Sequence, residues 1–276
     1  MVKHDIGLCL GNHKNRILEV GCGTGLGGLL FSQITETQPF IYYATDYAPN
    51  MLSLAYSRFE KKQLLSTPSL EVTHTPSLPT DKITLPEELP AKSQLHLLRA
   101  NGMDLPFVDE SFESYFSSIV VHIVPNPQKM IQEAYRVLKP NGIAAFGAWG
   151  RKQKSIFFTL LPKILIQNGI EIPDTAGAKS KFMLGGEGDE KIREYVANAG
   201  FKDVKIHYKD TEINILNMDV LWWFFAHDEP FSSILKKAGE EKTQEIKKQF
   251  CDTGEQYMKE NSKFISFENV IFTCYK

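Results

Sequence analysis

The sequence predicts an α/β fold with a mostly parallel sheet, and three observations support this prediction. Residues 17–34 are typical of a strand, a tight glycine turn and a helix. Strand-like and helix-like segments alternate after them. Residues 115–121 are nearly all apolar, as in a central parallel strand that is buried on both faces. With 276 residues, of which 42% are hydrophobic, we expect a single domain over residues 1–276 that carries insertions.

The glycine turn directly follows the first strand. The run Ile17–Val20 is apolar except for Glu19, and Gly21, Gly23 and Gly25 then interrupt it before an apolar helix. Glycine allows positive φ angles and lets a ligand come close to the backbone, and the start of the helix presents free N–H groups. We therefore expect this turn to bind a nucleotide-like cofactor.

The glycine spacing leaves two classes of cofactor open. Gly23, Gly25 and Gly28 match the Gly-x-Gly-x-x-Gly pattern of dinucleotide-binding enzymes, so an NAD(P)-dependent oxidoreductase is one alternative. Glu19 argues against it, because a carboxylate beside the turn repels a pyrophosphate and attracts an ammonium group. With this residue, the segment resembles motif I of the class I S-adenosylmethionine-dependent methyltransferases, whose glycine loop passes under the methionine end of the cofactor.

An acidic residue ends the second strand. Residues 40–45 are rich in β-branched and aromatic side chains, and Asp46 follows them. A carboxylate about 20 residues after the glycines can bind both hydroxyl groups of a ribose. The alternative is that Asp46 only caps the helix that starts near Pro49. The stretch Asp46–Leu52 also resembles the methyltransferases, which implies that Tyr47 and Met51 contact the cofactor.

A second motif follows the third strand. Residues Asn101–Glu113 resemble the type 11 methyltransferase family, which includes enzymes of ubiquinone and menaquinone biosynthesis. In that family an Asp at the position of Asn101 accepts a hydrogen bond from the adenine amino group. The amide carbonyl of Asn can accept the same bond, without the assistance of a charge. By the same resemblance, Gly102 and Met103 offer a backbone N–H group and an apolar edge to the adenine ring. Glu113 stands where the family has Asp.

The end of the fourth strand supplies the candidate for catalysis. We expect this strand over residues 115–121, with Ser117 among the cofactor contacts and His122 at the carboxyl end. Because ligands bind outside the carboxyl ends of parallel strands, His122 could face the transferred methyl group, or it could be a structural histidine. Asp104 and His227 are further candidates for a general base.

The resemblance covers roughly residues 16–60, 94–150 and 187–209. It implies a Rossmann-like, seven-stranded, mostly parallel sheet whose last strand is antiparallel and which is sandwiched by helices. Insertions are expected at about residues 61–93, 151–186 and 213–262. We expect the last two to cover the substrate side. Little precedes the first strand, where enzymes of this kind carry one or two helices. We therefore expect these insertions, or a partner chain such as a second copy in a homodimer, to supply the missing cover.

The composition argues against several partners. The 31 Lys and Arg residues are matched by 33 Asp and Glu residues, so the net charge of −2 gives no reason to expect nucleic acid. The four cysteines are scattered, which indicates a reducing compartment and no metal site. No apolar run reaches the roughly 18 residues of a membrane span and no cleavable signal is visible, so we expect a cytoplasmic protein.

The predicted function is methyl transfer from S-adenosylmethionine to a small-molecule acceptor by in-line displacement. The aromatic run Leu221–Phe225 favours an acceptor that is partly apolar. Two alternatives stay open. One is a catalytically silent, methyltransferase-like subunit that binds the cofactor and supports a partner, and the other is the NAD(P)-dependent oxidoreductase.

Overall fold

The computed structural model describes residues 15–34, 39–62, 68–173, 188–214, 217–261 and 264–276. The chain divides into two compact units. The first comprises Met1–Ala148, Asp189–His207 and Ile271–Lys276, and the second comprises Trp149–Gly188 and Tyr208–Val270. The second unit thus consists largely of the two insertions predicted after residue 150. That these insertions belong to a single domain and cover the substrate stays a prediction.

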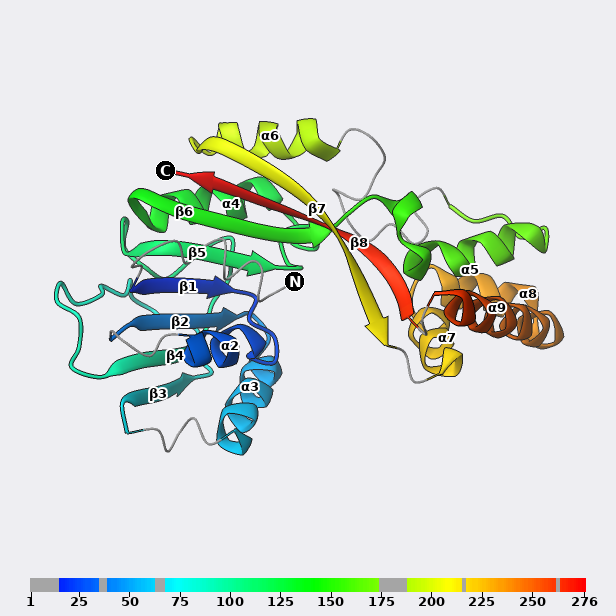
Figure 1. Ribbon diagram of the computed structural model, residues 1–276, viewed down its shortest axis with the longest axis horizontal. Helices are drawn as coiled ribbons and strands as arrows, with labels where there is room; N and C mark the ends of the chain where they lie inside the picture. The colour runs from blue at the N-terminus through cyan, green and yellow to red at the C-terminus, as the bar shows by residue number, and fades with distance from the viewer. Residues whose placement is uncertain (1–14, 35–38, 63–67, 174–187, 215–216, 262–263) are drawn as a thin grey trace. The chain divides into compact units, whose positions relative to one another are not determined.

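Among the described residues, eight strands form one sheet in the order β3-β4-β2-β1-β5-β6-β8-β7 (Figure 1). Their bounds are β1 (Arg16–Val20), β2 (Ile41–Asp46), β3 (Leu70–Thr75), β4 (Ser93–Arg99), β5 (Phe112–Ser118), β6 (Leu138–Trp149), β7 (Lys202–Asn214) and β8 (Phe264–Tyr275). The strands from β3 to β6 are all paired in parallel. From β1 the chain proceeds outward through β2 to β4 on one side of the sheet and then continues from β5 to β6 on the other, so a topological switch point lies between β1 and β5.

Strand β8 runs against its neighbours, as predicted for the last strand (Figure 1). In the first half of β6 the carbonyl of Gly142 accepts a hydrogen bond from the N–H group of Lys276. Just past the end of β6, the N–H group of Gly150 donates to the carbonyl of Glu268. These two bonds give β6 and β8 the register of an antiparallel pair.

The predicted number of seven strands is wrong, because β3 lies inside the segment expected to be an insertion over residues 61–93. Leu70 and Val72 point toward the core while Glu71 and Thr73 are exposed, which is the alternation of an edge strand. Each residue of β3 pairs in parallel with one of β4. The frequent prolines around this short strand hid its pattern in the sequence.

Helices cover both faces of the sheet in the first unit (Figure 1). They are α2 (Leu26–Ile34), α3 (Pro49–Lys61), α4 (Pro127–Val137) and α6 (Gly188–Asn198). Helices α2 and α3 share one face (Figure 1). Helices α4 and α6 lie together on the other, where Nε2 of Gln128 donates to the carbonyl of Tyr195. The predicted α/β class, with a mostly parallel sheet between helices, is confirmed.

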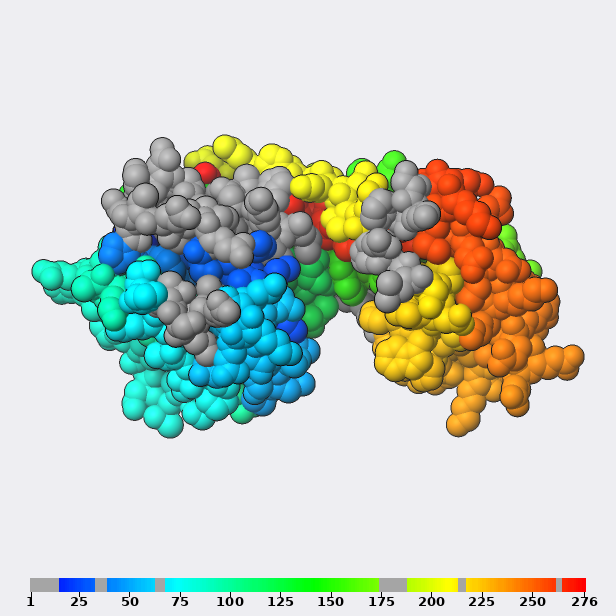
Figure 2. Space-filling view, turned by 60° about the horizontal axis from the view of Figure 1, so that its bottom comes forward, coloured from blue at the N-terminus to red at the C-terminus, as the bar shows by residue number. Residues whose placement is uncertain are grey.

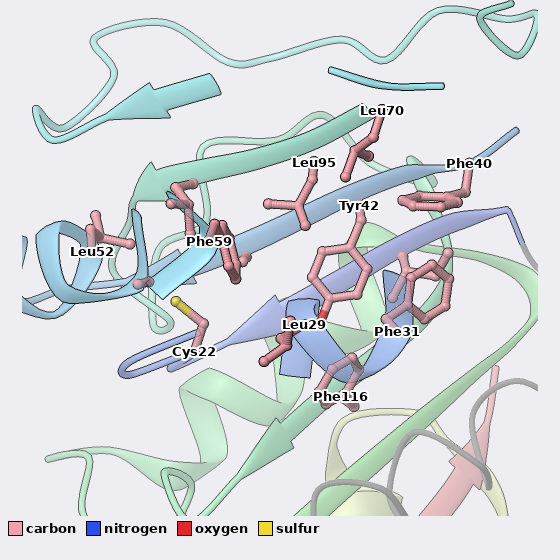
Figure 3. Packing of buried hydrophobic residues seen from close by; sticks show 14 of the residues in the cluster. Cys22, Leu29, Phe31, Phe40, Tyr42, Leu52, Phe59, Leu70, Leu95 and Phe116 are labelled. Carbon is pink, nitrogen blue, oxygen red and sulfur yellow. The ribbon is translucent and has the colours of Figure 1, made fainter. Parts of the chain in front are cut away.

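The core under α2 and α3 supports the strand ends that carry the predicted site (Figure 3). The ring of Phe31 lies 4.9 Å from the rings of both Phe40 and Tyr42. Phe59 of α3 is fully buried in the same cluster. Burying a side chain of this size stabilises the fold by about 1.5–3 kcal/mol. The glycine turn and Asp46 are therefore supported by a densely packed hydrophobic core.

The second unit has its own core. Its helices are η2 (Lys152–Lys154), α5 (Ile156–Gln167), α7 (Met218–Ala226), α8 (Phe231–Ala238) and α9 (Glu240–Glu260). Figure 2 shows α7 in yellow beside α8 and α9 in orange. The helical period divides the aromatic run of α7, since Trp222 and Phe225 are buried while Trp223 and Phe224 are 64% and 47% exposed. Within the described ranges, no helix is long and apolar enough to cross a membrane.

Candidate functional site

A cavity of about 460 Å³ lies in the first unit where parallel strands end. Val20 and Asp46 are the last residues of β1 and β2, and Ala100 directly follows β4. Val120, two residues beyond β5, completes this rim. The cavity thus occupies the carboxyl edge of the sheet at the switch point, where open parallel sheets bind their ligands.

Six of the predicted cofactor residues line this cavity, and they come from three separate segments of the chain. They are Gly21, Asp46, Tyr47, Asn101, Gly102 and Met103. The second unit also has hollows, of about 580 and 600 Å³, beside residues 170–173. Those hollows adjoin residues outside the described ranges and gather no strand ends, so we place the candidate site in the first unit.

The glycine turn is tied to the end of β2 through backbone hydrogen bonds. Gly21, Gly23 and Gly25 have φ angles of 76°, 53° and 76°, which side chains other than glycine rarely adopt. The N–H groups of Gly21 and Cys22 donate to the carbonyl of Thr45 at 2.8 and 2.9 Å. These bonds hold the turn against the end of β2, and the backbone of Gly21 forms part of the cavity wall.

Asp46 joins the glycine turn to the segment before α3. Its Oδ2 accepts a hydrogen bond of 2.8 Å from the N–H group of Gly23, and its Oδ1 accepts one of 2.9 Å from Ala48. The N-cap residue of α3 is Ala48, two residues after Asp46. Because Asp46 also accepts a bond from the glycine turn, it does more than cap that helix. A carboxylate has about four lone-pair sites, and each oxygen of Asp46 therefore keeps room for another donor.

Tyr47 and Met51, the other two cofactor contacts predicted in this segment, differ in their position relative to the cavity. Tyr47 lines the cavity with a side chain that is 60% exposed, and the guanidinium of Arg99 lies 5.5 Å from its ring centre. The Nε of Arg99 also donates to the carbonyl of Tyr47. Met51, in the first turn of α3, is half-buried and does not line the cavity.

The segment from Asn101 to Met103 forms a compact turn at the cavity. Oδ1 of Asn101 accepts a hydrogen bond of 3.0 Å from the N–H group of Met103. Its carbonyl accepts a second bond from Asp104. A Cβ at Gly102 would lie 2.8 Å from Cγ1 of Val20, so this close approach requires glycine. The amide oxygen of Asn101 keeps one lone pair, enough for the predicted adenine contact.

Two residues of α4 hold the chain that follows this turn, and sequence analysis missed them. Oε2 of Glu133 accepts a bond of 2.7 Å from the N–H group of Leu105. The guanidinium of Arg136 donates to the carbonyls of Leu105 and Phe107 and to the carboxylates of Asp109 and Glu133. Burial raises the pKa of Glu133, but the bonds from Arg136 and Leu105 outweigh it and lower the pKa below 4.5. The ion pair therefore stays charged at neutral pH.

Glu19 lies behind the glycine turn and does not line the cavity. It is 4% exposed, and the hydroxyl of Tyr42 donates to its Oε2 at 2.7 Å. A Cβ at Gly27 would overlap its carboxylate, which places it against the first turn of α2. Burial raises the pKa of Glu19 to about 7. The observed partners are thus a tyrosine and the helix backbone, whereas sequence analysis expected a ligand ammonium group.

The predicted end of the fourth strand is wrong by three residues. This strand, β5, ends at Ser118, because Ile119 takes a positive φ of 61° and turns the chain. His122 consequently lies in the following turn, is 1% exposed and does not line the cavity. Burial lowers its pKa to about 4, so the imidazole is neutral and weakly basic at pH 7. The hydroxyl of Ser117 donates to the carbonyl of Val20 inside the sheet.

The other candidates for a general base also lie outside the cavity. Asp104 is exposed and has Nζ of Lys82 at 3.7 Å. His227 belongs to the second unit, where its Nδ1 lies 2.9 Å from the carbonyl of Trp223. A catalytic role for His122, Asp104 or His227 stays a prediction.

Apolar residues that were not predicted form the rest of the cavity wall. They are Val20, Ala100, Val120, Ile123, Val124 and Pro125. Four of them follow β5, in the apolar segment before Pro127 opens α4. The apolar character of that segment could have predicted this part of the cavity wall, because residues just beyond the carboxyl end of a buried parallel strand lie at the edge of the sheet where ligands bind.

Comparisons with known proteins agree with this geometry. Residues 18–146 match the type 11 family described as "Methyltransferase domain". The biotin biosynthesis bifunctional protein BioHC of Teredinibacter turnerae is 31% identical over 144 residues, which are 51% of this chain and 20% of that protein. The demethylmenaquinone methyltransferase of Oceanobacillus iheyensis is 24% identical over 201 residues, 68% of this chain and 70% of that protein.

A solved structure supports the same fold. The YcgJ protein of Bacillus subtilis superimposes with a TM-score of 0.56 at 15% identity, covering 99% of this chain and 98% of that one. At this identity the likeness concerns the fold alone. The matched part of the chain spans 20, 28, 38 and 64% of the first four curated relatives, less than two thirds of each.

Proposed function

We propose that this chain, whose residues 18–146 belong to the type 11 methyltransferase family, binds S-adenosylmethionine and transfers the methyl group to a small, partly apolar acceptor. The observation that carries the proposal is the cavity itself. It brings glycine backbone, the carboxylate of Asp46 and the turn Asn101–Met103 to the carboxyl edge of one parallel sheet.

The cofactor has a natural orientation in this cavity. The adenine ring lies along Asn101–Met103, and the ribose hydroxyls donate to the remaining lone pairs of Asp46. The methionine end then extends over Gly21. When Glu19 is ionised, its negative charge behind the turn favours a sulfonium and an ammonium group over a diphosphate. This preference argues against the NAD(P)-dependent oxidoreductase.

Transfer of the methyl group mainly requires that the acceptor and the cofactor be held in the correct relative position. The acceptor attacks the methyl carbon in line with the sulfur, the carbon–sulfur bond breaks, and its electron pair stays on sulfur to leave S-adenosylhomocysteine. Holding two reactants in this geometry lowers a barrier by about 7–11 kcal/mol. The apolar residues Val120, Ile123 and Val124 line the same space, and a bound acceptor that covers them would displace water from it. The acceptor's proton leaves to solvent, or to a base where the acceptor is protonated at neutral pH.

The apolar wall also supports the acceptor class. Ile123 is 58% exposed although it lines the cavity, so an apolar ligand that covers it removes unfavourable surface from water. The relative from Oceanobacillus iheyensis is named as a demethylmenaquinone methyltransferase. We therefore expect a neutral aromatic or quinol-like acceptor.

A catalytically silent subunit that binds the cofactor and supports a partner is the second candidate. The buried position of His122 favours it, because the predicted base is removed from the cavity. The two candidates differ in turnover and share cofactor binding.

Calorimetry followed by an activity screen tests the proposal. We expect S-adenosylmethionine and S-adenosylhomocysteine to bind and NAD⁺ not to bind. Asp46→Ala should abolish binding, while Asp104→Ala, which removes an exposed aspartate outside the cavity, should leave it intact. Methyl release with quinols and phenols then identifies an enzyme, and binding without release identifies the silent subunit. Binding of NAD⁺, or unchanged affinity in Asp46→Ala, would overturn the proposal.

A further inference from the structure

Ile119 adopts a backbone conformation that is unusual for its side chain. Its φ of 61° lies in the left-handed region, which is a clear outlier for a β-branched residue. Such a conformation costs about 1–3 kcal/mol and persists where neighbouring structure enforces it. Here the N–H group of Ile119 donates to the carbonyl of Gly147 on β6 at 2.8 Å. This hydrogen bond, one residue beyond the end of β5, holds the backbone of Ile119 against β6.

The left-handed residue directs Val120 onto the glycine turn. The carbonyl of Val120 accepts bonds from the N–H groups of Ile123 and Val124, at 2.9 and 3.3 Å, which close the turn after β5. A Cβ at Gly21 would overlap Cγ2 of Val120 and would lie 3.1 Å from its Cβ. The valine side chain therefore rests directly on the backbone of Gly21.

Both members of this contact line the cavity. The isopropyl group of Val120 thus limits the space immediately above Gly21. Valine is stiff about its first side-chain torsion, and its backbone is held by Ile119, so it yields little to a larger ligand. A Cβ at Gly23 would meet no atom within 4 Å and one at Gly25 would meet Ala55 and Phe59 of α3, so among these three glycines Val120 restricts the space only at Gly21.

We propose that Val120, held by Ile119, is a specificity-determining residue that limits the size of the alkyl group on the cofactor sulfur. The inference rests on the proposed function, because it takes the methionine end of the cofactor to lie over Gly21. The methyl sulfonium fits beneath the valine. An ethyl sulfonium carries one more carbon and meets the isopropyl group.

Binding of S-adenosylmethionine and of its ethyl analogue S-adenosylethionine tests this role. We expect the wild-type protein to prefer the methyl cofactor at least about tenfold, the usual effect of one misplaced methylene in a tight pocket. In Val120→Ala this preference should fall to within about threefold. Val124→Ala is the matched control, because it shortens another valine of the same cavity and should keep the preference. Val120→Thr keeps nearly the same side-chain volume, so it should keep the methyl preference, and a preference lost in this variant would contradict a role for side-chain size.

The positioning role of Ile119 has its own test. Ile119→Asn should keep the methyl preference, since asparagine tolerates the left-handed region better than isoleucine and the turn is retained. A preference lost in this variant would contradict the claim that the left-handed backbone at this position, and not the isoleucine side chain, positions Val120. A preference that is unchanged in Val120→Ala, or that falls equally in Val124→Ala, overturns the inference. If the wild-type protein binds neither cofactor, the proposed function fails instead, so the two failures are distinguishable.

Discussion

The hydroxyl of Tyr42 donates a hydrogen bond of 2.7 Å to the carboxyl group of Glu19, and both side chains are buried. The pKa of Glu19 rises from 4.5 to about 7 as a net result: burial raises it most and the charge of Asp46 also raises it, while the hydrogen bonds from Tyr42 and from the N–H group of Gly28 lower it. Near neutral pH the carboxyl group is therefore divided between its two forms, directly behind the glycine turn. This pair makes the turn sensitive to pH.

Glu19→Gln should remove a pH dependence of stability. A carboxyl group whose pKa is raised on folding favours the folded state when protonated, so its contribution is full below pH 4.5 and is lost as the pH rises to about 7. The loss amounts to about 3 kcal/mol. Glutamine keeps the shape without the charge. Urea unfolding at pH 5 and pH 8 should show the variant gaining stability relative to the wild type at the higher pH. Parallel pH profiles of the two proteins would contradict the shifted pKa.

Tyr42→Phe should destabilise the protein more at pH 8 than at pH 5. At pH 8 the variant removes a hydrogen bond to a charged carboxylate, which costs about 1.5–3 kcal/mol, whereas a bond to the neutral acid is worth about 0.5–1.5 kcal/mol. Unfolding in urea at the two pH values measures both losses. Tyr115→Phe, which alters a buried tyrosine of β5, is the control and should cost the same at both. The same loss at both pH values in Tyr42→Phe would show that Glu19 is not charged.

Local features of the site were predictable because they are contiguous in sequence. The strand, glycine turn and helix of residues 17–34 are one unbroken motif, and Asp46 directly ends its strand. The turn at Asn101 follows β4 in the same way. Parallel strands present their carboxyl ends at a common edge, so adjacency in sequence was enough to bring these segments together.

Features that depend on which way a side chain points were not predictable. Every residue of β1 is buried, so the alternation that reveals a face is missing, and Glu19 could not be assigned to the side of Tyr42. The positive φ of Ile119 contradicts the preference of a β-branched residue and arises from its bond to Gly147. The hydrogen bond from Arg136 to the carbonyl of Leu105 likewise joins segments that are far apart in sequence.

Arg136→Lys should weaken both the fold and cofactor binding. The planar guanidinium bonds to two carbonyls and two carboxylates at once, which an ammonium group cannot reproduce. We expect a loss of about 1–3 kcal/mol in the free energy of unfolding, because the side chain is partly exposed. Loosening of the chain after Met103 should also raise the dissociation constant of the cofactor. Arg193→Lys on the exposed side of α6 should change neither quantity. Lower stability with unchanged cofactor affinity would mean that the network does not support the cavity.

Gly21→Ala separates the cost of backbone conformation from the cost of contact with Val120. Gly21 and Gly169 have similar φ angles of 76° and 70°, but a Cβ at Gly169 meets no atom within 4 Å. Gly169→Ala should therefore cost about 1–2 kcal/mol, the penalty of a left-handed alanine. Gly21→Ala should cost clearly more, since its Cβ overlaps the valine, and adding Val120→Ala should restore part of the difference. Chemical denaturation of the three variants measures these values. Equal losses at the two glycines, or no recovery in the double variant, would mean that Val120 does not press on the turn.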